Sequence, residues 1–150
     1  MSKFRVLVKY WLPVVGWMVL IFSASGDTKS AYHSSRIIEP FIRWLFPHIQ
    51  PDQIWPIVLF FRKCAHLTEY AVLAVLVWHA LRALSGQTGW PWRVARNAWF
   101  CVIAYAITDE VHQMFVPTRQ GSPWDVLIDS VGGAAGLLAL WAIGRWRKWW

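Results

Sequence analysis

The chain has 150 residues, of which 57% are hydrophobic and only 15% are charged. Soluble domains carry about 25% charged residues, so this composition excludes an ordinary soluble protein of this size. The formal net charge is +7, but the basic side chains flank apolar runs instead of forming one stripe, which argues against nucleic acid as a partner. The composition instead predicts one small membrane domain over residues 1–150.

The first apolar run, residues 4–25, is long enough to cross a bilayer. Lys3, Arg5 and Lys9 lie at its start and the small residues Ser-Ala-Ser at its end, so a cleaved signal peptide is the alternative interpretation. We favour a retained span, because the run is rich in Trp and reaches bilayer length once residues 4–9 join the helix.

Residues 26–55 form the longest polar segment, and apolar side chains recur at helical spacing within residues 34–46. This pattern predicts an amphipathic helix on the membrane surface, in the first external loop. Pro40 is expected to kink that helix or to mark its start. We expect the helix to pack against lipid or against the bundle, and the pattern indicates no substrate role.

Three further apolar runs follow, at residues 57–84, 94–116 and 124–143. A turn-rich loop, SGQTGWPW, separates the first two of these runs, and a tight loop, TRQGSP, precedes the last. Together with residues 4–25, the runs predict an all-α fold, a four-helix transmembrane bundle.

Basic residues gather at the N-terminus, around residues 82–96 and at the C-terminus. The positive-inside rule places both termini and the middle loop in the cytoplasm, so the loop with the amphipathic helix lies outside. Trp residues gather near both proposed membrane interfaces, as expected for aromatic belts.

Ionisable side chains also lie inside the apolar runs. A helix rises about 1.5 Å per residue, so counting from the cytoplasmic ends places Glu69, Asp109 and Asp129 at similar depths below the outer surface. Further out on the same helices we expect His66, His112, Arg62 and Asp125.

The facing of these side chains agrees with their depth. Arg62, His66 and Glu69 have the spacing i, i+4, i+7 and share one helix face. On the next run, Asp109 shares a face with Gln113. On the last run, a single stripe holds Asp125, Asp129, Gly132 and Gly136.

The two glycines of that stripe form a GxxxG motif, which permits close helix contact and turns the stripe toward the bundle. A charge at the bilayer centre costs about 2.5 to 3.5 kcal/mol on insertion scales. The charges therefore predict a buried polar site open to the outside. The alternative is that they only hold the helices together. We favour the site, because intramembrane ionisable groups are functional candidates by default.

Two stretches resemble the hallmark blocks of VanZ-like membrane proteins: RKCAHLTEYAVL (62–73) and TDEVHQMFVPTRQGSPWDVLIDSVGGAAG (108–136). The early IFSAS is similar to that family's first-span ending. The chain departs from the family pattern at Thr118, where members usually have Gly.

The resemblance implies a bacterial cytoplasmic-membrane protein with a retained first span. It also implies a cell-envelope role related to low-level resistance to the glycopeptide teicoplanin, and it implies no defined reaction. His112 fits members that have His there. The family-pattern residues present here are Arg62, Lys63, His66, Glu69, Tyr70, Asp109, Glu110, Gln113, Arg119, Asp125 and Gly132.

These observations support several hypotheses. In the first, Arg62, Lys63 and Arg119 bind an anionic lipid headgroup or a lipid-linked cell-wall precursor from the outer leaflet. A glycopeptide is a further candidate partner. In the second, the protein is a membrane-embedded hydrolase or transferase acting on a lipid, with a carboxylate as general base and a histidine as acid. Whether any reaction is catalysed stays open.

Carboxylate–histidine spacings also raise the idea of a metal site, although the order within the first pair is reversed relative to di-metal bundles, and we assign no metal ligand. No cofactor is identified. A small proton-coupled transporter ranks last, because four spans are few and no inverted repeat is visible. An oligomer is compatible with these patterns.

Overall fold

The computed structural model of the chain describes residues 3–26, 30–116 and 121–150. Within these ranges every regular element is a helix, which confirms the predicted all-α class. In chain order the elements are α1 (Lys3–Val6), a π-helical segment (Leu7–Trp11), α2 (Leu12–Gly26), α3 (Ser30–Leu45), α4 (Pro51–Ser85), α5 (Trp92–Gln113) and α6 (Pro123–Trp146).

Three helical stretches of the described chain are long and apolar enough to cross a membrane: Phe4–Ser25, Pro51–Ser85 and Pro123–Trp146. The first has the bounds of the first predicted run. α5 has 22 residues, enough for a span. It is not among the three, and its sequence includes Arg93, Arg96, Asp109 and Glu110.

α4 begins at Pro51, earlier than the apolar run at residue 57. Gln50 and Gln53 form a capping box there, and Pro51 occupies the first turn, where its missing N–H costs nothing. The helix ends at Ser85, and Gly86 caps it with a left-handed backbone (φ 64°) that suits glycine. At 35 residues the helix is about 52 Å long, more than the hydrocarbon core alone needs.

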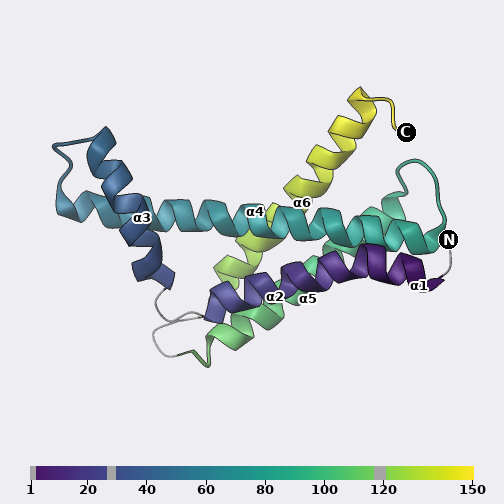
Figure 1. The fold of residues 1–150 in the computed structure, drawn as a ribbon, viewed down its shortest axis with the longest axis horizontal. Coiled ribbons are helices and arrows are strands. Elements are labelled where there is room, and N and C mark those ends of the chain that lie inside the picture. Colours follow the sequence, from purple (N-terminus) through teal and green to yellow (C-terminus); the bar gives the residue numbers. More distant parts are fainter. Residues whose placement is uncertain (1–2, 27–29, 117–120) are drawn as a thin grey trace.

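α4 is the central element, and α6 crosses it at close range (Figure 1). A Cβ added to Gly132 would lie 2.5 Å from the carbonyl oxygen of Leu67, and one added to Gly136 would lie 2.5 Å from that of Ala71. The GxxxG motif therefore forms the contact between α6 and the α4 backbone.

The core between α4, α5 and α6 combines small and medium side chains on α5 with larger ones on α4. Ala98, Val102 and Ala106 follow one face of α5 and are fully buried, as are Leu73 and Trp78 on α4. Many large apolar side chains on the outer faces of the helices are exposed instead, as expected for lipid contact.

α3 lies across the first turns of α4 (Figure 1). Ile42 on α3 is buried against Ile54 and Val58 of α4, whereas Phe41 and Trp44 are exposed. The helix runs through Pro40 without interruption, so Pro40 does not mark its start. α3 therefore packs one apolar edge against α4 and leaves other apolar side chains exposed.

The opposite end of α4 is rich in tryptophan. Trp78 stacks on Trp90 with ring centroids 4.7 Å apart, Trp150 packs against both rings, and Arg82 lies over Trp78 and Trp150. Trp78 is fully buried and belongs to the core rather than to an interfacial belt. Both termini and the 86–91 loop lie toward this end of the molecule (Figure 1).

Candidate functional site

Asp109 on α5 is the best-connected carboxylate inside the bundle and is only 1% exposed. Ser25 at the end of α2 donates a hydrogen bond of 2.7 Å to its Oδ2. Gln113, one turn along α5, donates to the same oxygen at 3.1 Å, and the hydroxyl of Tyr70 on α4 approaches it at 3.4 Å. Asp109 therefore links α2, α4 and α5.

Glu110 connects the same region to the start of α6. Its Oε2 accepts a hydrogen bond of 2.7 Å from the backbone N–H of Ser122, and its Oε1 accepts one of 3.3 Å from Gln113. The chain passes close to α5 here, since a Cβ on Gly121 would lie 2.5 Å from the carbonyl oxygen of Glu110. Ser122 also caps α6 by accepting from the N–H of Trp124.

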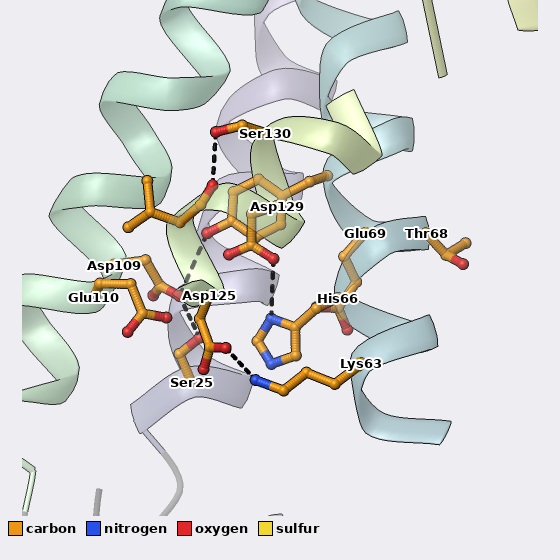
Figure 2. Close-up of polar contacts among 12 residues, drawn as sticks. Ser25, Lys63, His66, Thr68, Glu69, Asp109, Glu110, Asp125, Asp129 and Ser130 are labelled. Atoms are coloured by element: carbon orange, nitrogen blue, oxygen red, sulfur yellow. Dashed lines mark hydrogen bonds and ion pairs between the residues drawn. The ribbon is translucent and has the colours of Figure 1, made fainter. Parts of the chain in front are cut away.

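Asp129 on α6 faces His66 on α4 across the bundle (Figure 2). His66 Nδ1 lies 3.7 Å from Asp129 Oδ1, which is within ion-pair range but beyond a hydrogen bond. The Asp129 side chain is 1% exposed and that of His66 is 22% exposed. Among the described residues neither carboxylate oxygen of Asp129 has a hydrogen-bond partner.

Lys63 and Asp125 form an ion pair at the partly exposed edge of this region. Each lies about one helical turn before the deeper pair, Lys63 before His66 and Asp125 before Asp129 (Figure 2). The polar groups are thus arranged from an accessible edge to a buried end. We call the following residues the polar cluster: Ser25, Lys63, His66, Tyr70, Asp109, Glu110, Gln113, Asp125 and Asp129.

The other candidates from the sequence lie beside the polar cluster or outside the described residues. Glu69 is half-buried on α4, and its backbone carbonyl accepts a hydrogen bond of 2.9 Å from Trp17 Nε1. The ring of His112 stacks on Phe22 at 4.0 Å, between α5 and α2. Arg62 is half-buried on α4, next to Lys63. Arg119 lies outside the described residues.

Sequence reasoning did not single out Ser25 as a site residue. The signal that could have found it is the polar end of the first apolar run, where a hydroxyl closes an otherwise apolar helix. Its partner Asp109 is 84 positions away, so no helical spacing connects the two. Within the described ranges no group of three or more His, Cys, Asp or Glu side chains could hold a metal ion.

The positions of these side chains determine which chemical groups a ligand would meet. Lys63 offers an ammonium at the accessible edge, and His66 offers an imidazole between that edge and a buried carboxylate. Both oxygens of Asp129 and Oδ1 of Asp109 offer acceptors that have no hydrogen-bond partner among the described residues, although Asp129 lies within ion-pair range of His66. A ligand entering from the edge would meet donors first and acceptors deeper in the bundle.

Comparison with known proteins identifies the family. A family model described as VanZ/LLP1 matches residues 10–144, a range that includes every residue of the polar cluster. No curated protein sequence and no solved structure matches the chain. Because the match covers most of the 150 residues, the chain belongs to the VanZ/LLP1 family.

Proposed function

We propose that this protein is a multi-pass protein of the bacterial cytoplasmic membrane whose polar cluster binds a phosphate-bearing lipid headgroup or lipid-linked cell-wall precursor. Binding from the outer leaflet would alter the envelope and thereby affect glycopeptide susceptibility. The observation that carries this proposal is a polar cluster shared by α2, α4, α5 and α6 inside an apolar helix bundle.

The hydrogen bonding within the polar cluster favours a binding role over a purely structural one. A buried polar network that only holds helices together is expected to satisfy its members. Here the Ser25–Asp109 contact is satisfied, but both oxygens of Asp129 and Oδ1 of Asp109 have no hydrogen-bond partner among the described residues. These buried acceptors retain hydrogen-bonding capacity for a ligand that reaches them.

Lys63 supplies the group for a phosphate. Its side chain is 43% exposed, and its ammonium carries three donors, so pairing with Asp125 leaves donors for a headgroup. A cation near the membrane surface attracts anionic lipid groups by about 1 kcal/mol.

The orientation is part of this proposal. Both termini and the 86–91 loop lie toward the Trp-rich end of the bundle, whereas α3 lies near the other end of α4 (Figure 1). Basic side chains gather at the Trp-rich end, and we assign it to the cytoplasm. α5 is then the fourth span, and the polar cluster lies in the outer half of the membrane.

The proposal is tested by measuring bound phospholipid on protein purified in mild detergent, using native mass spectrometry. Wild type should retain phospholipid, and Lys63→Gln should retain several-fold less, because it loses the cation at the edge. Lys9→Gln is the matched control, since Lys9 is an exposed lysine on the π-helical segment and is not part of the polar cluster. Absence of bound phospholipid, or equal retention by the two variants, would contradict the proposal.

A lipid-modifying enzyme is the second candidate. The partly exposed His66 backed by the buried Asp129 resembles a general acid–base group oriented by a carboxylate. Incubation of the purified protein with radiolabelled phospholipid should then yield product. His66→Asn should abolish that turnover, and product formation by this variant at the wild-type rate would contradict the enzyme hypothesis.

A further inference from the structure

We infer that the deep end of the polar cluster accepts a primary ammonium group, so that the ligand is an aminophospholipid with its phosphate at Lys63 and its ammonium at Asp129. This inference rests on the proposed function, because it names the headgroup that the lipid site selects. Three features carry it: the balance of charge, the unpartnered buried acceptors and the spacing along the helices.

Carboxyl groups outnumber permanent cations in this region. Arg62 and Lys63 provide the permanent cations on the described part of the chain near the polar cluster. Five carboxyl groups lie in the same region, those of Glu69, Asp109, Glu110, Asp125 and Asp129, and Lys63 is paired with that of Asp125. A phosphate alone would bring further negative charge beside these carboxyl groups, whereas an ammonium would favour their ionised form and pair with it in a region of low dielectric constant.

The buried acceptors match an ammonium donor. Asp129 and Asp109 are each 1% exposed. Within residues 3–26, 30–116 and 121–150, both oxygens of Asp129 and Oδ1 of Asp109 lack a hydrogen-bond partner. A primary ammonium donates three hydrogen bonds and accepts none, so it suits a group of free carboxylate oxygens.

The helical spacing fits the dimensions of such a headgroup. Lys63 and Asp125 mark the partly exposed edge, and His66 and Asp129 lie about one turn deeper, which is about 5 Å along the helix axis. The short two-carbon link of phosphoethanolamine separates phosphate from ammonium by a distance of the same order. A ligand can thus place its phosphate at Lys63 while its ammonium passes His66 and reaches Asp129.

The test compares phospholipids that differ only in the headgroup, titrated onto purified wild type and followed by native mass spectrometry. Phosphatidylethanolamine should bind at least about tenfold more tightly than phosphatidylglycerol, the effect of one charge-assisted hydrogen bond. Asp129→Asn should reduce that preference to about twofold or less, because an amide offers no charge to the ammonium. Asp52→Asn, an exposed position on the first turn of α4, should keep the preference.

The wild-type comparison decides the question even if Asp129→Asn fails to fold. Equal binding of the two lipids would overturn the ammonium site and leave the proposed lipid binding intact, since water would then satisfy the free acceptors. Binding of water-soluble glycerophosphoethanolamine as tightly as the lipid would overturn the assignment to a lipid. If neither phospholipid bound, the proposed function itself would fail.

Discussion

At the scale of single residues, the protein places hydrogen-bonded and unpartnered polar groups side by side within one apolar bundle. Depth and helical facing, both available from the sequence, indicated that His66, Asp109 and Asp129 belong to one region, and the structure brings their side chains together. Neither depth nor facing gives the partner of each side chain. The approach of Ser25 to Asp109 depends on how α2 packs on α5, which no local pattern encodes.

Ser25→Ala tests the hydrogen bond from Ser25 to Asp109. It removes a hydrogen bond to a buried carboxylate and leaves Asp109 with one donor fewer, which should destabilise the fold by about 1.5 to 3 kcal/mol. Thermal unfolding in detergent should show a clearly lower Tm. Ser23→Ala removes an exposed hydroxyl that bonds only to the backbone of its own helix, so its Tm should match wild type. Equal melting of both variants would contradict the assigned contact.

Substitutions of Lys63 and Asp125 test the ion pair at the partly exposed edge of the polar cluster. Both side chains are partly exposed, so screening reduces their interaction, and a coupling of about 1 kcal/mol or less is expected. A double-mutant cycle of Lys63→Met and Asp125→Asn, read as unfolding free energies, measures it. Additive effects of the two substitutions would show that the pair contributes no stability, and its role would then be limited to the ligand.

At the scale of elements, helix packing was more predictable from the sequence than helix boundaries. The GxxxG spacing indicated the side of α6 that meets a neighbouring helix, and Gly132 and Gly136 lie against the α4 backbone. Hydropathy instead marks where the chain enters lipid, and α4 continues beyond that point because residues 50–53 cap it further upstream. The apolar stretch of α5 likewise extends past the end of its helix at Gln113.

Gly136→Ala tests the contact between α4 and α6. The added methyl group would lie 2.5 Å from the carbonyl oxygen of Ala71, a backbone atom that cannot move alone, so the helices must separate. A loss of about 1 to 3 kcal/mol is expected, the usual cost of overpacking. Gly16→Ala is the control, because nothing lies within 4 Å of a Cβ there. A Tm for Gly136→Ala equal to that of the control would contradict close packing.

At the scale of the whole molecule, the orientation in the membrane decides which leaflet the polar cluster meets, and the proposed function requires the outer leaflet. At the Trp-rich end Arg82 lies over the rings of Trp78 and Trp150, whereas the polar cluster lies toward the other end of α4. In the proposed orientation, which follows the positive-inside rule, the Trp-rich end lies in the cytoplasm and the polar cluster is directed outward. A cluster directed inward would not meet outer-leaflet lipid.

Single cysteines test this orientation in a background with Cys64→Ala and Cys101→Ala. His48→Cys, in the exposed turn after α3, should react with a membrane-impermeant maleimide added to the outer face of the membrane in intact cells. Gln87→Cys, in the exposed loop after α4, should react only after the membrane is permeabilised. The opposite pattern would place the polar cluster in the inner half of the membrane and contradict the proposed function.

The central claim is that the polar cluster acts on the envelope instead of only holding helices together. The most direct test is teicoplanin susceptibility of a strain lacking this protein, complemented with wild type, Asp109→Asn, Asp129→Asn or the control Asp52→Asn, with membrane insertion checked for each. Wild type and the control should shift susceptibility, and the two cluster variants should not. If well-inserted cluster variants shifted susceptibility as wild type does, the cluster would be structural and the claim would be wrong.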